Sequence, residues 1–183
     1  MDTVIKGTVV VAGTARSRLL ASSEPLSFWG GYDQVTGEII DRRHPLSGQM
    51  GAGKIIAVPF TRGSSTTTGI LLESVRAGVA PAGIITNEPD AYLALASIVA
   101  DEMYKKSFPV IAVGGEVFGK FKSGMDIEIT EEGTIRVMDG DKVDCEVGGD
   151  GVDSDEMDGD EMGRGEEGSD VEGSDGNEIE NDK

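Results

Sequence analysis

The pattern of apolar and polar positions divides the first 140 residues into short strands and two helices. Apolar runs at 55–60, 82–86 and 108–113 are typical of buried strands. Between them, the spacing predicts one helix over 66–77 and another that begins after Asp90 and ends at 105. This alternation of strands and helices predicts a parallel βαβαβ core with right-handed crossovers.

Each predicted helix has an apolar side that we expect to face the sheet. In the first helix Leu71, Leu72 and Val75 share one side, and Gly78 follows as a natural C-terminal stop. In the second helix, residues that recur every three or four positions predict the inner stripe: Tyr92, Leu95, Ala96, Val99 and Met103.

Shorter segments on both sides of this core also have the alternation of strands. Residues 4–12 and 18–22 predict two strands broken at Gly13. Residues 125–130 and 134–139 alternate apolar and polar positions around a short turn, which predicts a hairpin. The fold class is therefore α/β and rich in strands.

A polar, glycine-rich connection from residue 24 to residue 53 carries no long periodic element. Connections of this length in a compact domain are usually functional or disordered. Phe28, Trp29 and Tyr32 argue against disorder. We expect Trp29 to lie in the core or in an interface rather than against a cofactor.

Charge separates residues 141–183 from the rest of the chain. This segment has 18 Asp and Glu residues against 3 Lys and Arg, so it carries −15 of the net charge of −18. It lacks aromatic residues and has few aliphatic ones, which predicts a disordered, solubilising tail after a domain of residues 1–140. Its acidic positions lack the spacing of an EF-hand loop, and its charge would repel nucleic acid.

Other features exclude several classes of protein. Cys145, the single cysteine, predicts that this chain by itself forms no disulfide and holds no zinc ion or iron–sulfur cluster by thiolates. The start of the chain lacks the pattern of a signal peptide. No apolar stretch approaches the roughly 18 residues of a membrane span. We expect a soluble, cytoplasmic protein that binds neither membrane nor nucleic acid.

Candidate chemistry gathers in residues 59–69, which follow a buried strand and open a helix. Ligands bind at the carboxyl ends of parallel strands, and the N–H groups of a helix start attract anions. Arg62 can bind a carboxylate or phosphate through two hydrogen bonds, and Gly63 allows a close approach to the backbone. Ser64 and Ser65 lie in the positive potential of the helix start, which favours a serine alkoxide that acts as a base or nucleophile.

Other interpretations of these residues stay open at this point. Ser64 and Ser65 are also common helix caps. A hydrolase triad has little support, because no GxSxG elbow is present and His44 is distant in sequence. His44 contacts a substrate or partner, or it is an ordinary loop histidine, and we interpret Arg42 and Arg43 as surface charges.

Taken together, several motifs resemble the swivel domain of the aconitase X family in their order along residues 4–139. They are EPLSFWGGYD at 24–33, DRRHPL at 41–46, the run at 51–69 that contains Arg62-Gly63-Ser64-Ser65, and NEPD at 87–90. The resemblance implies an aconitase-like swivelling domain. It also implies a large partner subunit that carries an iron–sulfur cluster and most of the substrate site, so that this chain alone binds no cofactor.

The resemblance further implies roles for the residues of the site loop. Ser64, the serine after the Arg-Gly pair, is the expected catalytic base, and Arg62, Gly63 and Ser65 are expected to bind the substrate, a small hydroxy acid. The Arg-His-Pro-Leu stretch resembles the cis-3-hydroxy-L-proline dehydratase branch. The alternatives are the small subunit of a phosphomevalonate dehydratase and a non-catalytic binding or regulatory module.

Overall fold

A computed structural model describes residues 3–138 of the protein. The predicted disordered tail, Cys145 and the predicted domain end at residue 140 lie outside the described residues, so those expectations stay predictions. No helix within 3–138 is long and apolar enough to cross a membrane.

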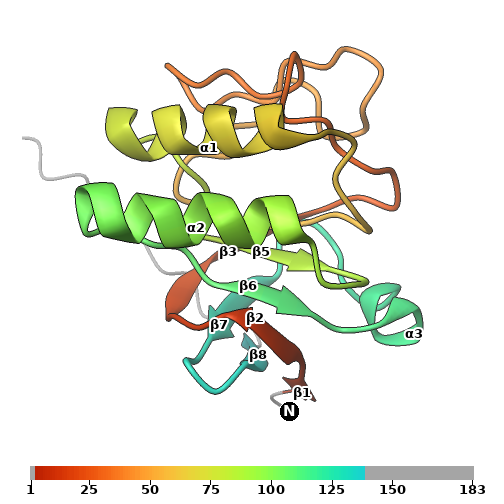
Figure 1. Ribbon diagram of the computed structural model, residues 1–183. Helices are drawn as coiled ribbons and strands as arrows, with labels where there is room; N and C mark the ends of the chain where they lie inside the picture. Colours follow the sequence, from red (N-terminus) through yellow and green to blue (C-terminus); the bar gives the residue numbers. More distant parts are fainter. Residues whose placement is uncertain (1–2, 139–183) are drawn as a thin grey trace, which may run out of the picture. The chain divides into compact units, whose positions relative to one another are not determined.

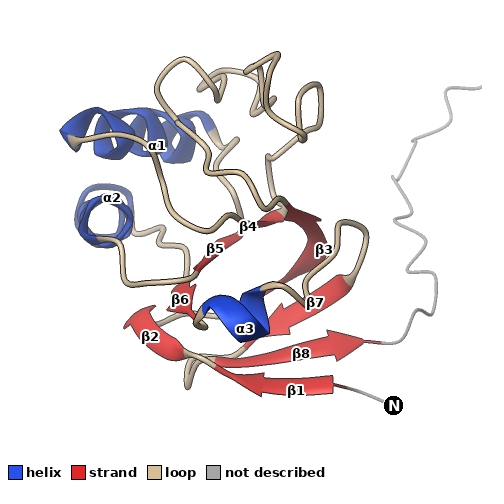
Figure 2. Cartoon of the chain, turned by 90° about the vertical axis from the view of Figure 1, so that its right-hand side faces the viewer, coloured by secondary structure: helices blue, strands red, loops and turns tan. Residues whose placement is uncertain are grey.

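Eight strands form one curved sheet in the order β1-β8-β7-β3-β4-β5-β6-β2. Figure 2 shows the sheet curling so that its two edge strands, which are consecutive in the chain, approach each other. The strands are β1 (Thr3–Lys6), β2 (Thr8–Val11), β3 (Ala15–Ala21), β4 (Ile55–Ala57), β5 (Gly83–Thr86), β6 (Val110–Ala112), β7 (Asp126–Ile129) and β8 (Thr134–Met138).

The predicted βαβαβ core is confirmed. Strand β4 pairs in parallel with β5, and β5 with β6, while α1 (Ser65–Ala77) and α2 (Ala91–Tyr104) are the crossovers. The two helices lie side by side over one face of the sheet (Figure 1). The hairpin of β7 and β8 is confirmed as an antiparallel pair. A single helical turn, α3 (Gly115–Phe118), follows β6.

Both predicted helix ends are confirmed by local geometry. Gly78 follows α1 in the left-handed conformation, with φ 76°. The carboxylate of Asp90 accepts hydrogen bonds from the backbone N–H groups of Tyr92 and Leu93 and so caps α2.

The predicted break at Gly13 is confirmed, because residues 12–14 are not in a strand, and the structure adds a second break that the sequence analysis missed. This second break falls at Gly7, so residues 4–12 form β1 and β2, which pair with β8 and β6 respectively. The N–H of Gly7 donates to the carbonyl of Gly133 at 2.9 Å. A Cβ at Gly7 would lie 2.3 Å from Ile111 Cγ2, so the crossing of the two sheet edges leaves room only for glycine.

The next strand begins earlier than predicted, at Ala15 instead of residue 18. Its first half pairs antiparallel with β7 and its second half pairs in parallel with β4. The first half of β3 contains no apolar run, because Arg16 and Arg18 alternate with smaller residues and only one face of this half is covered. The sequence pattern therefore did not predict it as a strand.

The predicted inner stripe of α2 is wrong at three of its five positions, because only Ala96 is buried and Val99 is half-buried. The buried residues are Leu93, Ala96, Ser97 and Ala100, whereas Tyr92, Leu95 and Met103 are 42%, 48% and 61% exposed. The helix has two apolar stripes, and the one with small side chains faces inward because α2 packs closely beside α1 and the sheet. In α1, Leu71 and Val75 are buried as predicted, and Leu72 is half-buried.

The long connection from 24 to 53 is ordered around buried aromatic rings. Phe28 and Tyr32 are almost fully buried, with ring centroids 5.5 Å apart. Trp29 is instead 66% exposed, so its predicted place in the core is wrong, and an interface role stays untested. In Figure 1 this orange segment runs along α1 on the side away from α2.

Candidate active site

The site loop begins where β4 reaches the carboxyl edge of the sheet, and three neighbouring segments anchor it. The carbonyl of Pro59 accepts a hydrogen bond from the N–H of Asn87 at 2.9 Å. The N–H of Arg62 donates to the carbonyl of Leu26 at 2.9 Å. The hydroxyl of Thr61 donates to the carboxylate of Asp90. These bonds hold the backbone in place immediately before Ser64.

Ser64 lies at the N-cap position of α1, but its side chain makes no capping hydrogen bond. Its carbonyl accepts from the N–H of Thr67 at 2.9 Å, and its exposed Oγ lies 3.4 Å from Oγ1 of Thr66. Side-chain capping by Ser64 is therefore not observed, and its catalytic role stays a prediction. Ser65 is the first residue of the helix and is also exposed.

Gly63 has a steric reason to be glycine. A Cβ at this position would lie 2.3 Å from Oγ1 of Thr67. Thr67 is fully buried, and its hydroxyl has no hydrogen-bond partner among the described residues. The backbone at Gly63 thus lies directly against the first turn of α1, which sets the position of Ser64.

Arg62 lines the same cavity as a loop that is distant from it in sequence. Its side chain lines a cavity of about 470 Å³ together with the loop at 41–45. The cavity is lined by Glu24, Pro25, Asp41, Arg43, His44, Pro45 and Arg62. Gly63, Ser64 and Ser65 are not among its lining residues. Arg43, which we interpreted as a surface charge, belongs to this cavity.

His44 is a structural residue of this cavity wall. The ring is 6% exposed. Its Nδ1 accepts from the N–H of Leu46 at 3.2 Å, and its Nε2 lies 3.1 Å from the carbonyl of Glu24, to which the Nε2–H tautomer donates. Because the main chain uses both ring nitrogens, the structure favours the loop-histidine interpretation over a substrate contact.

Two further groups keep the connecting loop in one conformation. The buried hydroxyl of Tyr32 donates to the carbonyl of Val79 at 2.6 Å, and burial raises the pKa of this phenol. Asp33 accepts from the N–H groups of Val35 and Thr36, and these bonds lower the pKa of its carboxyl group. Together they connect the loop to the end of α1 and stabilise its tight turn.

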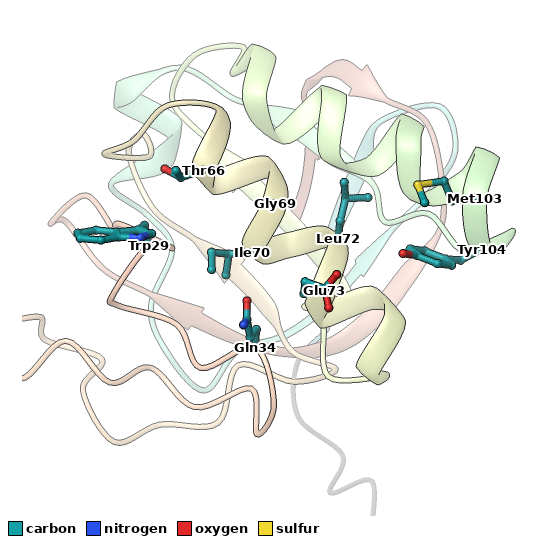
Figure 3. A pocket seen from close by; sticks show the side chains of 9 residues that line it. All are labelled: Trp29, Gln34, Thr66, Gly69, Ile70, Leu72, Glu73, Met103 and Tyr104. Carbon is teal, nitrogen blue, oxygen red and sulfur yellow. The ribbon is translucent and has the colours of Figure 1, made fainter.

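A second depression, of about 420 Å³, lies along the outer side of α1 (Figure 3). Trp29, Ile70, Leu72, Met103 and Tyr104 make it mainly apolar, and Glu73 is the one charged residue in its lining. Figure 3 shows Trp29 and Thr66 near the start of α1, at the end of the depression closest to the site loop. The depression lacks the cationic groups that would bind a small acid.

Potential metal ligands do not gather anywhere in the described part of the chain. Within residues 3–138, no three His, Cys, Asp or Glu side chains come together as a metal site. An iron–sulfur cluster therefore does not fit the residues described.

One sequence family matches almost all of the described residues. The profile of the aconitase X swivel domain matches residues 4–137. The chain belongs to the aconitase X swivel-domain family. The resemblance predicted from the sequence is thus confirmed, and the family implies an iron–sulfur large subunit beside a swivel domain such as this one.

Several known proteins are similar to this aconitase X swivel domain. The cis-3-hydroxy-L-proline dehydratase of Pseudomonas aeruginosa is 48% identical over 105 residues, which cover 57% of this chain and 18% of that enzyme. The phosphomevalonate dehydratase small subunit of Thermococcus gammatolerans is 34% identical over 137 residues, which cover 74% of this chain and 98% of that subunit. The crystal structure of Thermococcus kodakaraensis aconitase X in its holo-form aligns with a TM-score of 0.67 at 29% identity, over 75% of this chain and 99% of that one.

These comparisons confirm the aconitase-like α/β fold of the swivel domain. This chain spans only about a fifth of the length of the hydroxyproline dehydratases that it matches. The activity in the names of these relatives therefore supports a proposal for this chain.

Proposed function

We propose that this chain is the swivel part, or small subunit, of an aconitase X-type hydro-lyase, and that it supplies the serine base of a site completed by a large subunit. The observation that carries the proposal is the exposed Ser64 hydroxyl at the start of α1, which makes no capping hydrogen bond. Family membership and the almost complete overlap with a dehydratase small subunit support it.

In this proposal Ser64 removes the proton from the carbon next to the substrate carboxylate. The N–H groups at the start of α1 stabilise the serine alkoxide that acts as the base. The electron pair of the broken C–H bond forms the new double bond as the C–O bond breaks, and the hydroxyl group leaves with the C–O electron pair as hydroxide. The hydroxide takes a proton from solvent and departs as water. Ser64 holds the abstracted proton and returns it to solvent before the next turnover, and the loop N–H groups stabilise the charge that develops on the carboxylate.

Arg62 binds the substrate carboxylate, with Gly63 and Ser65 beside it. Its backbone is held by the bond to Leu26, and its side chain lines the charged cavity. A guanidinium that makes two hydrogen bonds to a carboxylate also orients the acidic carbon toward a fixed base. The rigid anchoring of the loop therefore serves the geometry of proton removal.

The large subunit is the proposed partner, and the iron–sulfur cluster belongs to it. The described residues of this chain provide no ligand group for the cluster. The contribution of this chain is the base, the carboxylate contact and the N–H groups of α1.

For the substrate we propose cis-3-hydroxy-L-proline, because the dehydratase of that name is 48% identical to this chain over the matched region. Loss of the C2 proton and the C3 hydroxyl group would first give the C2=C3 enamine, and transfer of a proton from its nitrogen to C3 would then give the cyclic imine Δ1-pyrroline-2-carboxylate. Phosphomevalonate dehydration is the second candidate, favoured by the end-to-end match with the Thermococcus gammatolerans small subunit.

The test is to assay the chain together with the aconitase X large subunit from the same organism, without oxygen, by trapping the cyclic imine. We expect activity only in the mixture, and a loss of about 10²- to 10⁴-fold in kcat for Ser64→Ala. Ser65→Ala is the matched control, since it removes a neighbouring exposed hydroxyl, and we expect it to raise KM with a much smaller effect on kcat.

Two results would count against this proposal. Full activity in Ser64→Ala would show that another group is the base. A mixture that binds tightly but dehydrates neither cis-3-hydroxy-L-proline nor phosphomevalonate would point to a non-catalytic binding module.

A further inference from the structure

The cavity beside Arg62 has charges of both signs in its wall. Two of its lining residues are cationic, Arg43 and Arg62, and two are anionic, Glu24 and Asp41. The ion pairs within 4.0 Å that join residues of the described part of the chain lie elsewhere, and none involves these four side chains. The cavity therefore offers separate positive and negative groups to a ligand.

Backbone hydrogen bonds fix the positions from which these groups extend. One carboxylate oxygen of Asp41 accepts from the N–H of Arg43 at 3.0 Å, and the carbonyl of Asp41 accepts from the N–H of His44 at 3.0 Å. His44 in turn connects this turn to the carbonyl of Glu24. Asp41 is half-buried, and its second carboxylate oxygen makes no hydrogen bond to a described residue.

The two candidate substrates place different demands on such a cavity. A phosphorylated hydroxy acid carries negative charge at both ends and offers no cation to the two carboxylates in the wall. A ring amino acid carries one carboxylate and one ammonium group, which match one cation and one anion. The volume of about 470 Å³ lies within the range of small-molecule sites.

We propose that this cavity binds the substrate as a zwitterion, with Arg62 on the carboxylate and Asp41 on the ring ammonium group. The inference rests on the proposed function and assigns the groups that select a cyclic α-amino acid as its substrate. Asp41 is then the residue that determines specificity against phosphorylated acids. Arg43 and Glu24 set the balance of charge at the rim, where they are exposed to solvent.

The experiment compares two ligands that differ only in the ammonium group. L-proline and cyclopentanecarboxylate have rings of the same size and one carboxylate each, and neither has a hydroxyl group to eliminate. We would measure both dissociation constants by calorimetry on the chain assembled with its large subunit. We expect L-proline to bind the wild-type complex at least about tenfold more tightly, as an ion pair shielded from water provides.

Asp41→Asn then tests the residue. Asparagine keeps an oxygen that accepts from the N–H of Arg43 but removes the charge, so the turn at 41–44 is retained. We expect the preference for L-proline to fall to about threefold or less, with little change for cyclopentanecarboxylate. Asp33→Asn is the matched control, because Asp33 also accepts backbone N–H groups in this loop yet does not line the cavity.

Equal binding of the two ligands by the wild-type complex would overturn the zwitterion site, with no need for any variant. An unchanged preference in a folded Asp41→Asn complex would overturn the assignment of Asp41. Both results come from binding, so they stay separate from the Ser64→Ala assay, which tests the proposed reaction.

Discussion

The hydroxyl of Thr61 donates to Oδ2 of Asp90 at 2.5 Å, while Oδ1 of the same carboxylate accepts from the N–H groups of Tyr92 and Leu93. One side chain thus caps α2 and holds the loop that leads to Ser64. The bond joins residues 29 positions apart. It couples the position of the proposed base to the end of a neighbouring helix.

This relationship predicts that Thr61 acts on catalysis without touching substrate. Thr61→Val removes the donor and keeps the shape of the side chain, so the loop loses one of its three anchors. We expect kcat to fall by about tenfold to a hundredfold, because small displacements of a base are costly. KM and the melting temperature are expected to change little.

Asp90→Asn separates the two roles of the carboxylate, because asparagine is an equally good helix cap. Its effect on kcat should be no larger than that of Thr61→Val, because the amide group can donate to the Thr61 hydroxyl in place of the present bond. The double variant should lose little more than Thr61→Val alone. Fully additive effects of the two substitutions would mean that the bond does not position the loop.

His44 is predicted to support the cavity through two main-chain hydrogen bonds. His44→Ala leaves the buried N–H of Leu46 and the partly buried carbonyl of Glu24 without their partner, so we expect a loss of about 1–3 kcal/mol in the free energy of unfolding. His44→Asn keeps an acceptor near Leu46 and should lose less. Denaturant unfolding measures both, with the exposed Arg42→Ala as control; equal stability of wild type and His44→Ala would contradict this role.

Gly63 and Thr67 are predicted to be coupled by their close approach. The Cβ of Gly63→Ala would displace the backbone before Ser64, so we expect kcat to fall by about tenfold or more. Thr67→Ala in the same chain removes the obstructing hydroxyl and should restore part of the activity.

Thr67→Val provides the complementary measurement on stability. It replaces a buried hydroxyl that has no partner among the described residues with a methyl group of similar size. We expect unchanged or greater resistance to denaturant, because no hydrogen bond is lost. A large loss of stability would show that the hydroxyl has a partner in solution.

Asp33 is predicted to make the free energy of unfolding of the domain vary with pH in the acid range. Backbone hydrogen bonds lower the pKa of its carboxyl group in the folded chain below its ordinary value of 3.8. The contribution of Asp33 to the free energy of unfolding is therefore complete at a pH above the pKa of the unfolded chain. It is lost as the pH falls through the lower pKa of the folded chain. The stability difference between wild type and Asp33→Asn should shrink over that acid range, and a difference that stays constant would contradict the prediction.

The sequence by itself determined the order of strands and helices in the core, both helix ends and the place of the site loop between a buried strand and a helix. These features depend on local causes. Asp90 and Gly78 end helices through bonds and backbone angles within a few residues. Residues 62–65 form a motif whose setting between strand and helix can be inferred from the neighbouring periodicity.

Only the tertiary structure decided which side of α2 is buried, where the first strand breaks and which loop lies beside Arg62. The helix has two apolar stripes, and the space left by α1 selects the smaller side chains of Ala96 and Ala100. Gly7 is required by contact with Ile111, which is far away in sequence. The charged cavity exists because packing brings Asp41 to Arg62, and no local pattern encodes a contact between such distant segments.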